Sequence, residues 1–275
     1  MKHLFGEELN IKILIGPWVG EFGWELFCWQ AFMRSFVEDN NIREVVCVTR
    51  SGRDLLYEDF ATVVTFNPKG NADMFMLKEV PVHTHEKLQE LSKGYLEQGF
   101  KIMPPQPLHY KGHPLQTSMG IFHPSFISYG EKKDACSFDI LFHCRSRSFR
   151  AGDNWDKESW DALLELCATY KVACIGSKEE SFSLEGATDL RGVPLRELVD
   201  YLASSRLIVG PSSGPMHLAT LCKCPQLVWS GNPANKIRYE KEWNPFDVKV
   251  VYLGEDRGGW NPDPIEVHKE ILDWV

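Results

Sequence analysis

The chain has 275 residues, 43% of them hydrophobic, which is enough to build one large core or two smaller ones. Its formal net charge is −8, with 30 basic against 38 acidic residues, so nonspecific binding to a nucleic-acid backbone is disfavoured, although a local basic groove is not excluded. No apolar run approaches the roughly 18 residues of a membrane span, and the N-terminus lacks a signal-peptide pattern. We therefore expect a soluble, cytoplasmic protein with no integral membrane segment.

The first half of the chain alternates strands with helices. Its apolar patterns predict a strand at 11–15, a glycine-rich loop at 16–23, a helix at 24–37, and strands at 44–48 and 63–66. Between residues 83 and 129 repeated prolines weaken the pattern. A polar stretch follows Gly130, and we place a domain boundary after residue 133.

The second half restarts the alternation. Strands are predicted at 139–143, 172–175, 207–209 and 226–229, and helices at 157–170, 195–204 and 215–222. Segments of this length favour parallel sheets covered on both faces, and hence an α/β chain of two Rossmann-like domains, residues 1–133 and 134–275. Ligands of such sheets bind beyond the carboxyl ends of the strands, so the loops at 16–23, 144–154, 176–178 and 210–214 are expected to line one cleft.

The eight cysteines are scattered, and several lie inside apolar runs, as reduced core cysteines do. Cys222 and Cys224 form a close pair, but no second pair follows at the spacing of a zinc site. The sequence therefore predicts neither a disulfide framework nor a bound metal.

The turn at 210–214 has the Gly-x-Ser-x-Gly spelling of a nucleophile elbow, which would expose Ser212 as the nucleophile of a serine hydrolase. Such an enzyme needs its acid and its histidine later in the chain. Only His217 and His268 follow, and His217 lies on the same predicted helix as the turn. The hydrolase is kept as an alternative.

A second interpretation of the same turn is a phosphate site. A helix that begins near Pro215 presents free backbone N–H groups and a positive dipole end, so Ser212, Ser213 and Gly214 would hold an anion. The simpler alternatives are that Ser213 only caps the helix and that His217 is a packed helix residue.

Three arginines follow the strand that opens the second half. Arg145, Arg147 and Arg150 fall within six residues at the end of a strand that is expected to face the same cleft. Guanidinium groups there could pair bidentately with a diphosphate, and the alternative is a solvated basic loop.

Residues 210–219 and 224–232 resemble the donor-site signature of the heptosyltransferase-like glycosyltransferases, family nine. The resemblance covers roughly residues 139–235 and departs at Ser212, where that family usually has an aspartate, so the sugar is not expected to be a heptose. It implies a GT-B fold, with two Rossmann-like domains facing across a cleft. It also implies an inverting, metal-independent transfer from a nucleotide sugar that the C-terminal domain holds.

The resemblance further implies that Glu21 is the catalytic base, because family members carry a Gly-Asp loop where this chain has Gly20-Glu21. A carboxylate there could take the proton of the acceptor hydroxyl. The alternatives are that Glu21 caps the following helix and that Glu25 is a surface residue. The glycines do not spell a dinucleotide fingerprint, and no cofactor is expected beyond the nucleotide sugar as co-substrate.

The full set of residues predicted to bind the donor is Gly20, Gly23, Arg145, Arg147, Arg150, Gly176, Ser177, Ser212, Ser213, Gly214, Pro215, Met216, His217, Arg238 and Glu240. The acceptor stays open between a glycan, a lipid-linked saccharide and a hydroxylated DNA base. A nucleotide-sugar binding module without catalytic activity is the remaining alternative.

Overall fold

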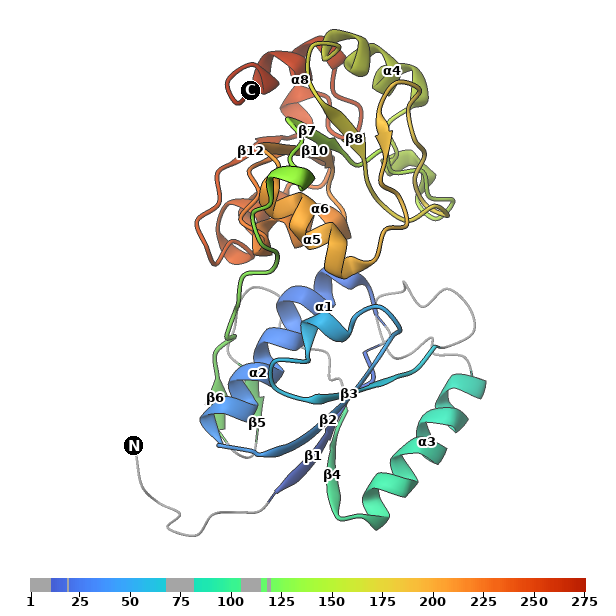
Figure 1. Ribbon diagram of the computed structural model, residues 1–275, viewed down its shortest axis with the longest axis vertical. Coiled ribbons are helices and arrows are strands. Elements are labelled where there is room, and N and C mark those ends of the chain that lie inside the picture. Colours follow the sequence, from blue (N-terminus) through green and yellow to red (C-terminus); the bar gives the residue numbers. More distant parts are fainter. Residues whose placement is uncertain (1–10, 19, 68–81, 105–114, 118–119) are drawn as a thin grey trace. The chain divides into compact units, whose positions relative to one another are not determined.

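The computed structural model describes residues 11–18, 20–67, 82–104, 115–117 and 120–275 (Figure 1). The chain forms two compact units, Met1–Ser125 and Phe126–Val275, here called unit 1 and unit 2. The sequence patterns place the domain boundary a few residues later, between 133 and 134.

Unit 1 is built on a parallel sheet with the strand order β3-β2-β1-β4. A short antiparallel hairpin, β5-β6, accompanies this sheet. The elements are β1 (Lys12–Ile15), α1 (Phe22–Cys28), α2 (Gln30–Asp39), β2 (Glu44–Thr49), β3 (Thr62–Thr65), α3 (Val82–Glu97), β4 (Phe100–Met103), β5 (Leu115–Thr117) and β6 (Gly120–Phe122).

The predicted helix at 24–37 is two helices, because the backbone leaves helical geometry at Trp29, with φ −129° and ψ −71°. The indole ring of Trp29 stacks on that of Trp18, with 6.0 Å between the ring centroids. Helix α3 and strand β4 lie in the stretch where prolines weakened the pattern. Leu88, Leu91 and Tyr95 of α3 have helical spacing and pack against the sheet.

Unit 2 contains a parallel sheet of six strands with the order β12-β11-β10-β7-β8-β9. Its elements are β7 (Ile140–Phe142), α4 (Lys157–Leu166), β8 (Val172–Cys174), β9 (Thr188–Asp189), α5 (Leu195–Ser204), β10 (Leu207–Pro211), α6 (Gly214–Leu221), β11 (Gln226–Trp229), α7 (Ala234–Ile237), a π-helical turn (Arg238–Glu242), β12 (Val250–Leu253) and α8 (Pro264–Ile271).

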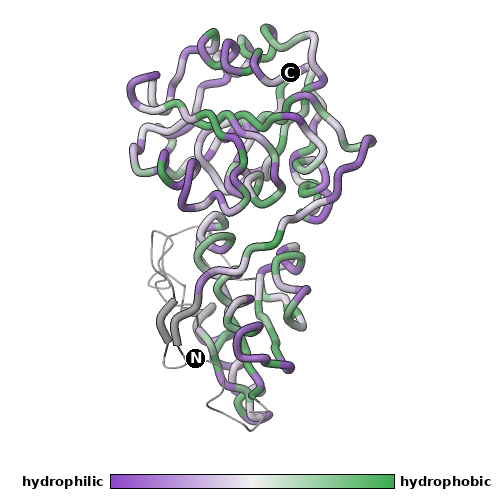
Figure 2. Tube along the Cα trace, turned by 90° about the vertical axis from the view of Figure 1, so that its left-hand side faces the viewer, coloured by the Kyte–Doolittle hydropathy of each residue, from purple (hydrophilic) through white to green (hydrophobic). Residues whose placement is uncertain are grey.

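Helices cover both faces of this sheet: α4 and α8 lie on one face, and α5 and α6 lie on the other (Figure 1). The connection from β7 to β8 and the connection from β10 to β11 run in opposite directions across the sheet. Because such crossovers are right-handed, their helices must lie on opposite faces. Figure 2 shows hydrophobic segments through the middle of the unit. In the core of this unit, Trp155, Trp160 and Trp229 pack with ring centroids 4.9 to 5.6 Å apart.

Candidate functional site

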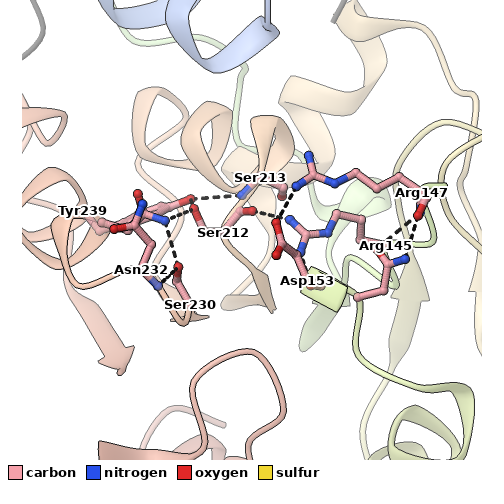
Figure 3. A network of polar contacts seen from close by, with 10 residues as sticks. Arg145, Arg147, Asp153, Ser212, Ser213, Ser230, Asn232 and Tyr239 are labelled. Carbon is pink, nitrogen blue, oxygen red and sulfur yellow. Dashed lines mark hydrogen bonds and ion pairs between the residues drawn. The ribbon is translucent and has the colours of Figure 1, made fainter. Parts of the chain in front are cut away.

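The strand order of unit 2 reverses between β7 and β10, which are neighbours with Phe142 opposite Val209. In open parallel sheets a ligand binds outside the carboxyl ends of the strands at such a reversal. Arg145 follows β7 and Ser212 follows β10, so the topology itself brings them together. The Arg145 Nη1 donates to the Ser212 carbonyl oxygen at 2.6 Å (Figure 3).

Arg145 is a buried cation, with 3% of its surface exposed. Its guanidinium donates to the carbonyl oxygens of Ser212 and Asp153, and its Nε has no hydrogen-bond partner among the described residues. No ion pair formed within the described parts of the chain includes Arg145. Burial lowers its pKa to about 10, and the charge of Arg147 adds to this effect, so the group stays charged near neutral pH.

The other two predicted arginines differ from Arg145. Arg147 donates to the Asp153 carboxylate at 2.9 Å and is therefore paired. Arg150 has a left-handed backbone, with φ 52°, and its exposed side chain lies over the Phe149 ring. The structure thus gives Arg145 the position facing the turn, gives Arg147 a carboxylate partner beside it, and directs Arg150 to solvent.

Ser212 is held by hydrogen bonds through its backbone and its side chain. Its N–H donates to the Trp229 carbonyl oxygen at 2.8 Å, and its Oγ accepts from Asn235 Nδ2 at 3.1 Å and from the Tyr239 hydroxyl at 3.2 Å. Burial raises the pKa of Tyr239, so the phenol stays protonated. Neither partner can act as a base toward Ser212, which disfavours the serine hydrolase.

Ser213 occupies the N-cap position of α6, but its side chain makes no capping hydrogen bond. The Ser213 Oγ is buried and has no partner in the described part of the chain, while its N–H donates to the Tyr239 hydroxyl at 3.2 Å. The N–H groups of Gly214 and Met216 belong to the first helical turn, where no intrahelical acceptor exists, and Pro215 has no N–H. The turn therefore offers one hydroxyl and two amides to an anion.

His217 lies deeper in the unit than the turn. Its ring is 6% exposed and stacks on Tyr239 with centroids 4.4 Å apart, and it meets Trp243 edge to face at 4.7 Å. Burial lowers the pKa of His217 to about 3, with a further contribution from Arg238, so the imidazole is neutral.

The predicted donor-binding residues Arg238 and Glu240 contact the site less directly than Tyr239, which lies between them. Arg238 donates to Asn235 at 3.1 Å and lies over the Trp243 ring, whereas Glu240 is exposed and lies 3.9 Å from Lys236. Tyr239, which the sequence analysis did not single out, reaches both serines of the turn (Figure 3). Its aromatic character within a polar segment is the only signal that the sequence carries.

The loop after β8 contains two further predicted residues. Gly176 lies against Ser181 and His143, where an added Cβ would be 2.6 Å from the Ser181 Oγ. The exposed Ser177 Oγ accepts from the Glu180 N–H at 3.1 Å. Gly176 therefore serves close packing, and the Ser177 hydroxyl is part of a local turn.

In unit 1, Glu21 directly precedes α1 and is half-buried. The Trp18 indole N–H donates to the Glu21 carbonyl oxygen at 3.2 Å. The Glu21 side chain makes no capping hydrogen bond to α1, so the simple capping role is not observed. Gly20 lies against the Trp18 ring, and Gly23 is buried within α1.

Glu25 is fully buried, so the alternative that it is a surface residue is wrong. Its carboxylate accepts hydrogen bonds from Tyr57 at 2.7 Å and from Thr49 at 3.2 Å, and it forms an ion pair with Arg53. Its backbone N–H donates to the Glu21 carbonyl oxygen at 3.1 Å. This network ties the first turn of α1 to the end of β2 and to the segment that follows it.

Several solved glycosyltransferases share this fold. The E. coli ADP-heptose LPS heptosyltransferase II aligns with 96% of this chain and 98% of its own, at 14% identity and a TM-score of 0.61. A family 9 glycosyl transferase from Veillonella parvula DSM 2008 aligns with 98% of this chain and 91% of its own, at 12% identity and a TM-score of 0.58. The fold is that of the GT-B glycosyltransferases. This confirms the fold that the sequence resemblance implies.

A third structure is the dodecameric iron-containing heptosyltransferase TibC in complex with ADP-D-beta-D-heptose, with 15% identity and a TM-score of 0.51. The alignment covers 88% of this chain, which spans 63% of the length of TibC. No protein-family model and no curated protein matches the sequence.

Among the residues described for this chain, no group of three or more His, Cys, Asp or Glu is placed to hold a metal ion. Metal independence itself stays a prediction. All eight cysteines are free thiols. Within the described segments, no helix combines the length and the apolar character needed to cross a membrane.

Proposed function

We propose that this chain is a glycosyltransferase that moves a sugar from a nucleoside diphosphate sugar to an acceptor hydroxyl. Unit 2 holds the diphosphate of the donor on the turn Ser212–Met216 and on Arg145. Glu21 of unit 1 acts as the general base.

The observation that carries this proposal is that the buried Arg145 guanidinium forms no ion pair with any residue that the structure describes. A buried guanidinium is normally paired with a carboxylate or another anion, because its desolvation is costly. Among the described residues its hydrogen-bond acceptors are carbonyl oxygens, and Arg145 lies beside a turn that offers the Ser213 hydroxyl and the amides of Gly214 and Met216. A diphosphate would supply the missing negative charge and would accept hydrogen bonds from these donors.

The same groups support the chemistry of transfer. As the acceptor oxygen forms a bond to the anomeric carbon, the bond to the diphosphate oxygen breaks, and negative charge grows on the leaving group. Arg145 and the donors of the turn stabilise that charge, an effect of about 2.7 to 4 kcal/mol for one well-placed hydrogen-bond donor. The proton of the acceptor hydroxyl passes to the Glu21 carboxylate. Inversion at the anomeric carbon is part of the proposal, since attack and departure occur on opposite sides.

The proposal extends to the class of donor sugar and of acceptor. A neutral Ser212, with its hydroxyl bonded to Asn235 and Tyr239, favours a donor sugar other than the heptose of the structural neighbours. The acceptor is a glycan, a lipid-linked saccharide or a hydroxylated DNA base.

Binding of the donor is tested by a thermal-shift panel of ADP, GDP, UDP, CDP and dTDP and of their sugar conjugates. A ligand present at 100 times its Kd should stabilise the native chain by about 2.7 kcal/mol. Arg145→Ala should sharply reduce the shift, and the exposed Arg150→Ala serves as the matched control. If no member of the panel raises the melting temperature of the wild-type chain, the proposal is wrong.

Catalysis is tested separately with Glu21→Gln. This variant should keep the affinity of wild type for the nucleotide and lose turnover by roughly 100-fold or more. Unchanged turnover would remove Glu21 from the mechanism. Donor binding with neither transfer nor hydrolysis, for any acceptor class, would instead identify a binding module without catalytic activity.

A further inference from the structure

Trp260 lies on a tight loop beside Arg145, in a part of unit 2 that the sequence analysis did not single out. The loop follows β12 and contains Gly258, whose φ is 95° and where an added Cβ would be 2.7 Å from the Asn261 carbonyl oxygen. The Gly259 N–H donates to the Gly254 carbonyl oxygen at 2.9 Å. These constraints turn the chain back and fix the place of Trp260.

The loop is also anchored to the core. The buried Trp155 indole donates to the Pro262 carbonyl oxygen at 3.1 Å. Gly231, which follows strand β11, lies against the Trp260 ring. A Cβ at position 231 would be 2.6 Å from Trp260 Cδ1. Only glycine permits so close an approach, so the indole of Trp260 is held between two fixed segments.

The face of this ring meets the unpaired cation. The Arg145 Cζ lies 5.2 Å from the centroid of the Trp260 ring, within the range of a cation–π contact. The guanidinium is thus held by the carbonyl oxygens of Ser212 and Asp153 and by the indole face. None of these three partners carries a full negative charge, so they orient Arg145, while the Asp153 carboxylate pairs with Arg147 and acts on Arg145 only at longer range.

We propose that Trp260 is a positioning residue for diphosphate recognition. Its indole face holds the Arg145 guanidinium in the orientation in which it faces the Ser212–Met216 turn. This inference rests on the proposed function. It predicts that an aromatic ring is needed at position 260 for affinity toward the diphosphate, whichever base the nucleotide carries.

The test measures binding of inorganic pyrophosphate and of ADP, GDP, UDP, CDP and dTDP to full-length variants by calorimetry. Trp260→Leu should weaken pyrophosphate and the tightest nucleotide by the same factor, roughly fivefold to thirtyfold. Trp260→Tyr, which keeps an aromatic face, should stay within about threefold of wild type. The matched control is Trp274→Leu, because Trp274 also has a cation over its ring, Lys249 at 3.8 Å, but has no contact with Arg145.

A double-mutant cycle separates positioning from a general loss of structure. In an Arg145→Ala background, Trp260→Leu should cause no further loss of affinity, because the group that Trp260 orients is gone. Gly231→Ala gives a second route if Trp260→Leu fails to fold, since it displaces the ring without removing it, and it should weaken pyrophosphate as well.

Four results would overturn the inference. A loss of nucleotide affinity with unchanged pyrophosphate affinity would make Trp260 a platform for the base, and additive losses in the double mutant would show that it does not act through Arg145. Loss of binding in Arg145→Ala without any change in Trp260→Leu or Gly231→Ala would reject this inference and leave the proposed function intact. A wild-type chain that binds none of the probes would reject both.

Discussion

Replacing Glu25 by alanine is expected to lower the free energy of unfolding of unit 1 by about 3 to 5 kcal/mol, because it breaks a buried ion pair by removing one partner. The Glu25 side chain is fully buried, and that of Arg53 is 16% exposed. The variant would leave the guanidinium without its counter-charge and would also remove the acceptor of the Tyr57 and Thr49 hydroxyls.

The amide variant divides this loss into its parts. Glu25→Gln keeps an oxygen that can accept from Tyr57 or Thr49 but loses the charge that compensates Arg53. Each buried hydroxyl that loses its acceptor costs about 1 to 3 kcal/mol. The free energy of unfolding of Glu25→Gln should therefore lie between those of wild type and Glu25→Ala.

Two measurements give these changes in the free energy of unfolding: urea denaturation monitored by tryptophan fluorescence, and thermal denaturation monitored by calorimetry. The matched control is Glu44→Ala, because the Glu44 carboxylate also forms an ion pair in unit 1, with Lys12 at 2.9 Å, but is 47% exposed. An exposed pair contributes about 0 to 1 kcal/mol. If Glu25→Ala is no more destabilising than Glu44→Ala, the network does not anchor α1, and the account of how the segment after Glu21 is held fails.

Three further predictions concern unit 2. Burial lowers the pKa of His143 to about 4 and that of His217 to about 3, so below pH 6.5 the unfolded chain binds more protons than the folded chain, and stability falls as the pH falls. Each histidine should lower the free energy of unfolding by about 2 kcal/mol between pH 6.5 and pH 5. Urea titrations at several pH values should show that the free energy of unfolding of His217→Phe depends less steeply on pH than that of wild type. Tyr239→Phe should cost about 1 to 3 kcal/mol in the same titrations, because the Ser213 N–H loses its acceptor, and an unchanged midpoint would contradict the hydrogen bond. Arg150→Ala should change nucleotide affinity by less than about twofold in calorimetry, since an exposed charge contributes little, and a loss as large as that of Arg145→Ala would return Arg150 to the site.

Much of unit 2 could be predicted from the sequence because its signals are local. The apolar runs at 207–209 and 226–229 mark β10 and β11, and α5 begins and ends at the predicted residues. Ser212 and Ser213, between β10 and α6, and Pro215 in the first turn of α6 mark the turn of the site. Short-range patterns suffice for these elements because their own residues carry the signal, whichever strands they pair with.

The misses follow from longer-range contacts. Tyr239 reaches the Ser212 hydroxyl across 27 positions through a π-helical turn, and no periodicity announces that arrangement. A surface position for Glu25 was one alternative, yet Arg53 and Tyr57, which come from a later segment, hold its buried carboxylate. Arg150 lies only five positions from Arg145, but its own backbone is left-handed and its side chain is exposed.

The distribution of charge around Arg145 carries the functional argument further than the resemblance of folds does. Asp153 is close enough to contact both arginines, and its carboxylate pairs with Arg147 while only its carbonyl oxygen reaches Arg145. A carboxylate on Arg145 would stabilise the empty fold, but it would compete with any phosphate. The arrangement instead keeps a desolvated cation beside unpartnered donors, at a cost to the empty protein that an anionic ligand would offset. Introducing a carboxylate beside Arg145 should therefore raise the free energy of unfolding of the empty protein and, in the same variant, lower its affinity for the nucleotide.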